Sequence, residues 1–396
     1  MKEILNQSGN QSLVYIIAGE VSGDALGAAL IRELRKKSKG KIEFVGIGGD
    51  QMEAEGVNSL FPISEMAVMG IFELLPHVPR LMKRIEQTVA DVLCKNPAAL
   101  ITIDSKAFTM RVAKRIYKRQ SGVKERIRLI HMVAPTVWAW RPRRAKQIAK
   151  FLDHLLTLFP FEPPYFTKHG LKTTFVGHPA SEQPEGNGAG YRQLFNIEEK
   201  MKVVTLLPGS RPGEVSRLLP IFGKTIELLH KRYSNLHIAI PTVSSVEELV
   251  RRKTSSWAFP ISITTGIDQK LGAFSASSIA LAASGTITLE LAIAKVPTVV
   301  AYRVNPFTVP IASLLVDLSS VVLPNRLLEK KVFPLFLQWQ CKPESLFLEM
   351  CRQLDSPCGH KKLAEVGTDI RKSLRASDKP GAAFAADTVF SELSDL

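Results

Sequence analysis

The stretch Ile279-Ala280-Leu281-Ala282-Ala283-Ser284-Gly285-Thr286-Ile287-Thr288-Leu289-Glu290 joins two kinds of pattern. Its first five residues are apolar and mostly small and predict a buried strand, while residues 289–295 predict a helix. Between them, residues 284–286 are small or hydroxylated, so we expect backbone N–H groups there that can meet an anion where the helix dipole favours phosphate. The stretch therefore predicts a strand, a ligand-binding loop and a helix in succession.

Two ligand groups suit this loop. Ser284, Gly285 and Thr286 can bind a diphosphate, and Glu290, one turn into the helix, can accept hydrogen bonds from ribose hydroxyls. A diphosphate and a sugar diol together indicate a nucleotide-sugar. The alternative is an ordinary N-capped helix in which Ser284 or Thr286 is the cap.

The same alternation of strand and helix extends along the chain on both sides. The predicted strands are 13–18, 43–47, 99–103, 129–133, 155–158, 202–207, 236–240, 261–264, 279–283 and 296–302. The predicted helices between them are 25–37, 78–93, 110–119, 217–233, 246–253, 268–276 and 289–295. This order predicts an α/β protein whose parallel sheets are covered by helices on both faces.

The chain of 396 residues is long enough for two domains. A segment rich in Pro, Gly, Glu and Ser, 179–190, interrupts the pattern before it restarts. We therefore expect an N-terminal domain at 1–185, a second domain at 186–365, and a helical segment at 366–396 that packs back on the first domain or on a partner. Ligands of such sheets bind at the carboxyl ends of the strands, so we expect a cleft between the two.

The formal net charge of +15 is unevenly placed. Between Arg111 and Lys150 there are thirteen Lys or Arg residues and one acid, Glu125. Such a strip can meet nucleic acid, anionic lipid or a phosphorylated substrate. No common nucleic-acid motif is present, so we expect no nucleic-acid partner. A solvated helix face is the alternative for 114–119.

Neither metal nor export signals are apparent in the sequence. The four cysteines and the histidines lack metal-ligand spacing, so we expect no metal and no cofactor. The first twelve residues are polar and no window reaches the roughly 18 apolar residues of a membrane span. We expect a soluble cytoplasmic protein with free thiols.

Candidate catalytic groups come first from the N-terminal half. Glu20 and Asp24, in a glycine-punctuated loop after the first strand, would repel phosphate and suit sugar hydroxyls; turn formation and helix capping are the alternative. Asp104 ends the strand 99–103, where a carboxylate can act as general base on a hydroxyl, or else cap the next helix. In the second half, Arg211 follows the strand 202–207 and its planar fork suits a diphosphate.

An apolar segment, 66–81, predicts either a core helix or an element that dips into lipid or holds acyl chains. Trp138 and Trp140 stand beside the basic run 141–144, as is typical of a membrane interface.

Together these segments resemble the lipid A disaccharide synthase family of glycosyltransferases over residues 17–344. The motifs that carry the resemblance are, in order, Ala18-Gly19-Glu20-Val21-Ser22-Gly23-Asp24, Ala67-Val68-Met69-Gly70, Val137-Trp138-Ala139-Trp140-Arg141, Pro160-Phe161-Glu162, Val176-Gly177-His178-Pro179, Leu207-Pro208-Gly209-Ser210-Arg211, Ser284-Gly285-Thr286 with Leu289-Glu290, and Leu323-Pro324-Asn325 with Gln338.

The resemblance implies two facing Rossmann-like domains of the GT-B type. It implies an inverting, metal-independent transfer from UDP-2,3-diacylglucosamine to 2,3-diacylglucosamine 1-phosphate, which forms a β-1,6 disaccharide and UDP. The implied partners are these two lipids and the anionic surface of the inner membrane, on its cytoplasmic face. A homodimer with exchanged C-terminal segments is also implied.

On this resemblance, the catalytic residues are Asp104, as general base, and Glu20. The implied substrate-binding residues are Asp24, Ser22, Met69, Arg211, Ser284, Gly285, Thr286, Glu290 and Asn325.

Some positions depart from the family pattern, mostly on the acceptor side. The usual small residue, Pro, Asp, Phe and Asn after Asp104 are here Ser105-Lys106-Ala107-Phe108-Thr109. The usual Ser-Pro-Ser is Ala134-Pro135-Thr136, and an acid is replaced by Leu335. Two alternatives therefore stay open: a paralogue with a changed acceptor or lost turnover, and another nucleotide-sugar enzyme such as a UDP-sugar epimerase.

Overall fold

A computed structural model describes residues 12–66, 78–123, 125–138, 142–303, 322–356 and 359–394. The chain divides into two compact units: unit 1 is Met1–His178 with Arg375–Leu396, and unit 2 is Pro179–Leu374. The sequence-based prediction placed the boundaries after residues 185 and 365 instead. Among the described residues, no helix has both the length and the apolarity needed to span a bilayer.

Unit 1 is built on a six-stranded parallel sheet in the order β2-β1-β3-β4-β5-β6. Its strands are β1 (Ser12–Ala18), β2 (Ile42–Ile47), β3 (Ala99–Ile103), β4 (Arg128–Met132), β5 (His154–Thr157) and β6 (Lys172–Phe175). Its helices are α1 (Val21–Ser38), α2 (Asp50–Ala54), α3 (Val78–Lys95), α4 (Thr109–Arg119), α5 (Arg144–Ile148), α6 (Pro164–Thr167) and α16 (Gly381–Ser394).

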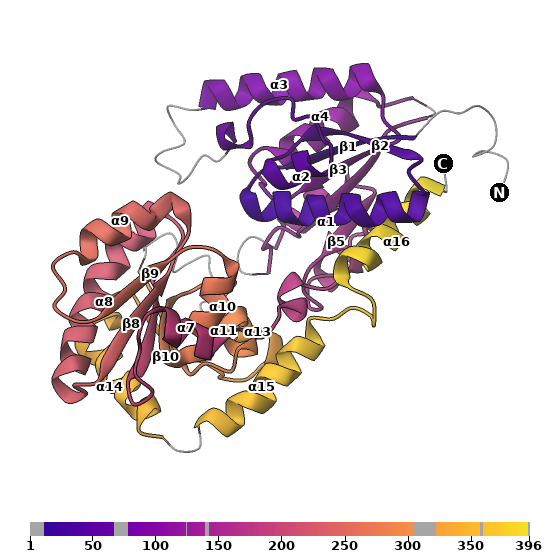
Figure 1. The fold of residues 1–396 in the computed structure, drawn as a ribbon. Helices are drawn as coiled ribbons and strands as arrows, with labels where there is room; N and C mark the ends of the chain where they lie inside the picture. The colour runs from indigo at the N-terminus through magenta and orange to yellow at the C-terminus, as the bar shows by residue number, and fades with distance from the viewer. Residues whose placement is uncertain are drawn as a thin grey trace. The chain divides into compact units, whose positions relative to one another are not determined.

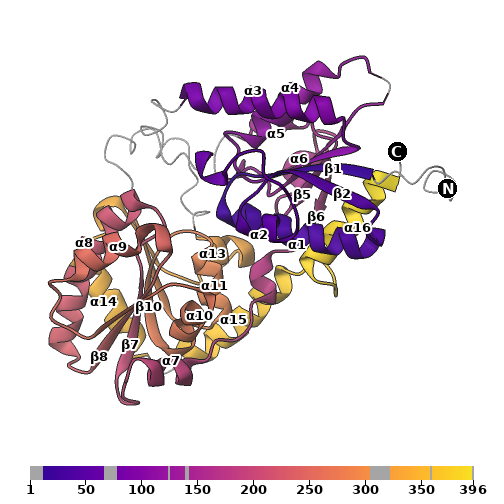
Figure 2. The same cartoon turned by 45° about the horizontal axis from the view of Figure 1, so that its top comes forward.

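Helices cover both faces of this sheet (Figures 1 and 2). On one face, Tyr15 and Ile17 of β1 join a core that includes Ile85 and Val89 of α3 and Val112 of α4. The other face is covered by α1, with α16 beside it. Because both faces are buried, strands such as β3 are apolar throughout.

Unit 2 repeats the plan with a parallel sheet in the order β12-β11-β10-β7-β8-β9. Its strands are β7 (Lys202–Leu207), β8 (Leu236–Pro241), β9 (Ile261–Thr264), β10 (Ser277–Ala283), β11 (Thr298–Tyr302) and β12 (Leu335–Leu337). Its helices are α7 (Gly188–Leu194), α8 (Pro212–Arg232), α9 (Ser244–Thr254), α10 (Ile267–Ala276), α11 (Ile287–Ile293), α13 (Leu323–Leu328), α14 (Pro343–Leu354) and α15 (Gly359–Ser373). One face packs against α8, α9 and α14, and the other against α7, α10 and α11.

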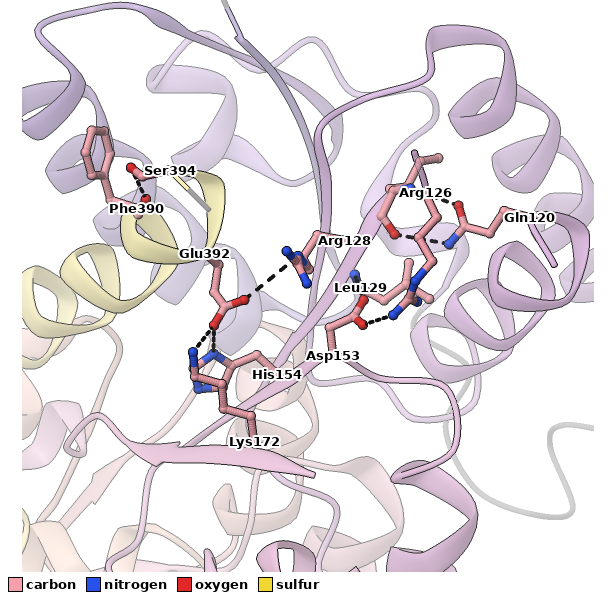
Figure 3. A network of polar contacts seen from close by, with 11 residues as sticks. Gln120, Arg126, Arg128, Leu129, Asp153, His154, Lys172, Phe390, Glu392 and Ser394 are labelled. Carbon is pink, nitrogen blue, oxygen red and sulfur yellow. Dashed lines mark hydrogen bonds and ion pairs between the residues drawn. The ribbon is translucent and has the colours of Figure 1, made fainter. Parts of the chain in front are cut away.

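The C-terminal helix is fastened to the amino edge of the unit 1 sheet (Figure 3). Glu392 of α16 accepts hydrogen bonds from Lys172 Nζ at 2.6 Å and His154 Nδ1 at 2.9 Å, and Arg128 Nε lies 3.9 Å from its other oxygen. These three partners are the first residues of β4, β5 and β6. A neutral His154 suits both its contacts, since Nδ1 donates to Glu392 while Nε2 accepts from the Thr174 hydroxyl at 2.8 Å.

Candidate active site

Two loops of unit 1 meet at the carboxyl edge of its sheet. The ends of β1 and β3 are neighbours, with Ala18 opposite Ile103. A Cβ added to Gly19 would lie 1.9 Å from the Cβ of Ser105, so only glycine allows the approach. The contact brings Glu20, the exposed N-cap residue of α1, beside the turn that carries Asp104.

The backbone of that turn is strained. Asp104 and Ser105 both have positive φ, 49° and 46°, which non-glycine residues adopt at a cost of about 1–2 kcal/mol each. The Asp104 N–H donates to the Met132 carbonyl at 3.0 Å, and Thr109 Oγ1 donates to the carbonyls of Asp104 at 2.5 Å and Ser105 at 3.0 Å. These bonds hold the half-buried Asp104 in one place.

Lys106 crosses from this turn to the loop after β4. Its Nζ donates to Thr136 Oγ1 at 3.1 Å. Burial lowers the pKa of Lys106 below its ordinary value, and the charge of Arg144 acts in the same direction, whereas the carboxylates of Asp104, Glu162 and Glu20 oppose it. The sequence identified Lys106 only as a departure from the family pattern.

Glu162 is a buried acid that the sequence showed only as part of a motif. Its oxygens accept hydrogen bonds from Trp138 Nε1 at 3.2 Å and from the Phe159 N–H at 3.1 Å. Burial raises the pKa of Glu162 to about 7, against these bonds and the charge of Lys106. The sequence feature that could have identified it as a site residue is its place as the single acid in an aromatic run after the predicted strand 155–158. We call Glu20, Asp104, Lys106, Thr136 and Glu162 the unit 1 cluster.

Three other predicted residues of this half differ in their placement. The carboxylate of Asp24 is buried and accepts the backbone N–H groups of Gly49, Gln51 and Met52 at 2.8–3.0 Å. These are the contacts of a cap for α2, which is the alternative to a sugar contact that the sequence leaves open. Ser22 is exposed in the first turn of α1, and Met69 lies outside the described residues.

In unit 2, Arg211 is placed at the start of a long helix. It is the N-cap residue of α8, has a side chain 59% exposed, and lies 3.5 Å from Glu214 Oε1. Gly209 has a φ of 118°, and a Cβ there would meet the Glu214 side chain. Arg211 is therefore presented to solvent above the positive end of the α8 dipole.

Tyr302 and Arg217 also lie in this region, and no pattern in the sequence identified either of them as a site residue. Arg217 Nε donates to the Arg303 carbonyl at 3.1 Å, next to the carboxyl end of β11. Burial raises the pKa of Tyr302, as does the charge of Glu214, while Arg211 and Arg217 lower it. We call Arg211, Glu214, Arg217 and Tyr302 the unit 2 cluster.

The loop at 284–286 leaves β10, which lies between β7 and β11 in the sheet. Gly285 has open space where a Cβ would be, and Thr286 is the N-cap position of α11 without a capping side-chain bond. Thr288 Oγ1 donates to the Gly285 carbonyl at 2.7 Å. The helix begins at Ile287, two residues before its predicted start.

Glu290 and Asn325 are already engaged within unit 2. Glu290 Oε2 forms an ion pair with Lys270 Nζ at 2.5 Å, and its side chain is 20% exposed. The Asn325 side chain accepts the N–H groups of Val332 and Phe333 and donates to the Phe333 carbonyl, at 2.9–3.0 Å. Asn325 therefore ties α13 to the loop before β12, at the wall of a cavity of about 950 Å³.

Within the described part of the chain, no group of three or more His, Cys, Asp or Glu side chains is placed to hold a metal ion. Among the described residues, the cationic groups near the carboxyl edges include Lys106 in unit 1 and Arg211 and Arg217 in unit 2.

Comparison with known proteins shows to which family the chain belongs. A family model described as Lipid-A-disaccharide synthetase matches residues 14–387. The chain belongs to this family. It is 44% identical over 384 residues to the lipid-A-disaccharide synthase of Rhodospirillum centenum, which covers 96% of this chain and 95% of that protein. The enzyme of Gluconobacter oxydans is 38% identical over 97% of this chain and 90% of its own length.

Solved structures show the same fold at low identity. A UDP-GlcNAc 2-epimerase from Neisseria meningitidis, bound to UDP-GlcNAc, matches with a TM-score of 0.64 and 12% identity, over 97% of this chain and 100% of that one. The calicheamicin glycosyltransferase CalG4 matches with a TM-score of 0.59 and 13% identity, over 98% and 99%. The prediction of a GT-B-type α/β fold is confirmed, and the protein is a lipid-A-disaccharide synthase family glycosyltransferase of lipid A biosynthesis.

Proposed function

We propose that the protein transfers 2,3-diacylglucosamine from its UDP derivative to the 6-hydroxyl of 2,3-diacylglucosamine 1-phosphate, with inversion, giving a β-1,6 disaccharide and UDP. The observation that carries the proposal is the family match over 14–387, which takes in parts of both units. The likeness to epimerases lies at 11–14% identity and supports the fold alone.

Unit 2 would bind the UDP part of the donor. Arg211, exposed at the N-terminus of the 21-residue helix α8, supplies a planar cation for the diphosphate, with Arg217 six residues further along the chain. The loop of Ser284, Gly285 and Thr286 would bind the diphosphate through its backbone N–H groups, and the open space at Gly285 would let the ligand come close. The carboxylate of Glu290, which forms an ion pair with Lys270, would accept hydrogen bonds from the ribose hydroxyls.

Unit 1 would supply the acceptor chemistry. Asp104 takes the proton of the attacking hydroxyl, because its turn is held by hydrogen bonds and a base must keep its geometry to be effective. Glu20, which follows the close contact of Gly19 with Ser105, would bind sugar hydroxyls on the same edge, with Ser22 next to it. Asp24 is left out of the sugar contacts, since its oxygens cap α2.

We extend the proposal to a metal-independent reaction. Guanidinium groups neutralise the leaving diphosphate, which a divalent ion does in other transferases. Turnover that persists in excess EDTA is the expected result, and loss restored by Mg²⁺ would contradict it.

The basic strip is proposed to meet an anionic membrane through α4. Its exposed residues include Arg111, Lys114 and Lys118, with Tyr117 39% exposed among them. The protein should sediment with phosphatidylglycerol vesicles and not with phosphatidylcholine vesicles, and the binding should weaken with salt.

The test of the reaction is to incubate the protein with both lipids and no added metal, and to detect UDP and disaccharide by mass spectrometry. Product confirms the proposal. UDP binding without product would favour a paralogue with lost turnover, and binding of neither would overturn the proposal. The hydrogen bond between Lys106 and Thr136 supports turnover by the altered acceptor loop, because two positions that depart from the family pattern contact each other there.

A further inference from the structure

A cavity of about 950 Å³ lies beside the edge strand of the unit 2 sheet. Its wall includes β12, the outermost strand in the order β12-β11-β10, with parts of α13 and α14. Of the substrate-binding residues expected from the sequence, Asn325 lines this wall, and its side chain is already bonded to Val332 and Phe333. The proposed transfer reaction therefore leaves the cavity unused.

Among the described residues that line the cavity, cations outnumber acids. The lining cations are Arg326, Lys330, Lys331 and Lys342, and the lining acids are Glu329 and Glu349. The Glu349 carboxylate accepts hydrogen bonds from Arg352 at 2.6 and 2.9 Å, so a cation that is not part of the wall balances its charge. Lys330 lies 3.8 Å from Asp369 in a pair more than half exposed on both sides, which is a weak contact. An anion in the cavity would therefore meet net positive charge.

The same cavity has an apolar side. Its wall includes the run Phe333-Pro334-Leu335-Phe336, and the lining residue Trp339 is 75% exposed. Leu348 of α14 is 66% exposed. It comes three residues after Ser345 and one before Glu349, both of which line the cavity, so it lies on the adjoining face of the helix. Two large apolar side chains thus meet solvent beside the lysines.

A phospholipid combines the two chemistries that this cavity can bind. Its phosphate suits the lysines, its acyl chains suit Trp339 and Leu348, and indole and lysine side chains together are typical of a membrane surface. Ligand pockets measure about 300–1,000 Å³, so the volume is more than a free phosphate ion needs. An acidic peptide or a nucleic acid would satisfy the cations but leave Leu348 exposed. Leu335, in place of the acid of the family pattern, removes a charge that would repel an anion.

We propose that this cavity binds the phosphate headgroup of an anionic phospholipid in a bilayer, with Trp339 and Leu348 entering the lipid beside it. The headgroup would lie among Lys330, Lys331 and Lys342, whose ammonium groups form charge-assisted hydrogen bonds with phosphate oxygens. The site is separate from the basic face of α4, which belongs to unit 1, and it does not depend on the proposed transfer reaction. Each unit would then have a lipid contact of its own.

Fluorescence of Trp339 tests the site without turnover. The full-length protein is mixed with vesicles of equal parts phosphatidylglycerol and phosphatidylcholine whose acyl chains carry bromine, which quenches tryptophan on contact. The Trp339 signal is the difference between the wild type and Trp339→Phe. It should be quenched by these vesicles and not by brominated phosphatidylcholine alone. The control Trp257→Phe removes a tryptophan that packs against Phe259, and it should leave this quenching intact.

Charge variants test the phosphate contact. Lys330→Gln, Lys331→Gln and Lys342→Gln combined should weaken binding to the phosphatidylglycerol vesicles by about 10–100-fold, because each lysine at an anionic surface contributes roughly fivefold. All three side chains are exposed, so the variant should fold normally. A matched control removes three exposed cations of α8 and α9, and it should change the binding far less: Lys224→Gln, Lys231→Gln and Arg252→Gln.

Quenching of Trp339 that is lost in the triple lysine variant confirms the site. A Trp339 signal that brominated vesicles do not change overturns it, as does a lysine variant that binds as tightly as its control. A change of the Trp339 signal with glycerol phosphate or inorganic phosphate alone, and none with vesicles, would assign the cavity to a soluble anion and also overturn the proposal. So would a dimer, seen by sedimentation, that Trp339→Ala abolishes, because a second copy would then cover this face.

Discussion

The two edges of the unit 1 sheet use buried charges in opposite ways. At the amino edge, burial alone would raise the pKa of Glu392, but the hydrogen bonds from Lys172 and His154 outweigh it and the pKa is lowered. At the carboxyl edge, burial prevails: the pKa of Glu162 is raised to about 7 and that of Lys106 is lowered. The first pattern stabilises the folded protein at neutral pH.

The second pattern costs stability, because an acid with a raised pKa and a base with a lowered pKa each favour their neutral forms. Groups with displaced pKa values at the carboxyl edge of a parallel sheet are typical of a site that handles protons. We therefore propose that the amino edge serves stability and the carboxyl edge serves chemistry. Variants of each edge test that division.

The largest effect is expected for Asp104→Asn. Loss of the proposed general base should lower kcat by about 10²–10⁴-fold, while the affinity for UDP stays near that of the wild type, because the proposed UDP-binding residues, Arg211 among them, are in unit 2. Steady-state kinetics and calorimetric titration with UDP measure the two quantities. Turnover close to the wild-type value would remove Asp104 from the mechanism.

Glu162 should make the stability of unit 1 depend on pH. Because its pKa is raised from 4.5 to about 7, Glu162 binds more protons in the folded protein than in the unfolded chain between these values, so its contribution to the unfolding free energy falls as the pH rises across them. The fall is at most about 3 kcal/mol. The buried His131 and His178, whose pKa values are lowered to about 3 and about 4, contribute in the opposite direction. The difference in unfolding free energy between the wild type and Glu162→Gln, measured by urea unfolding from pH 4.5 to 8, should show the slope due to Glu162. The difference between the wild type and the exposed Glu43→Gln should not vary with pH, and a difference for Glu162→Gln that does not vary with pH would contradict the raised pKa of Glu162.

Glu392→Gln should lower the stability of the protein without changing its turnover. Losing the charged bonds to Lys172 and His154 should cost about 1–2 kcal/mol at pH 7, discounted because Lys172 is 59% exposed, and leave turnover unchanged. Since the pKa of Glu392 is lowered, its contribution is fully present above its ordinary pKa and is lost as the pH falls through the lowered value. The control is Asp387→Asn, an exposed ion pair of the same helix. A fall in turnover without a loss of stability would contradict the assignment of the amino edge to stability alone.

The smallest effect extends the comparison to unit 2. Arg211→Ala should weaken UDP binding about tenfold, or ~1.4 kcal/mol, because the exposed arginine contributes one charged contact among several. The exposed Arg252→Ala on α9 should bind UDP normally. Unchanged UDP affinity in Arg211→Ala would refute its diphosphate role.

The sequence predicted most of the fold. All ten predicted strands are present within two residues of their expected ends, because parallel strands buried on both faces are continuous apolar runs. The two missed strands, β6 and β12, are at sheet edges, where burial is incomplete and Lys172 or Leu335 need not follow the pattern. Helix α8 began five residues earlier than expected, at Pro212, since proline is favoured in the first turn.

The sequence by itself determined the alternation of strands and helices, the glycine-punctuated loops at the strand ends, and through their motifs the family. These features are local, because propensity, periodicity and turn chemistry act between near neighbours. The tertiary structure alone decided that Asp24 caps α2, that Glu162 is buried beneath Trp138, that Lys106 meets Thr136, and that Glu392 binds His154 across 238 residues. Burial and charge environment depend on side chains brought together from distant segments, so they arise only when the chain has folded.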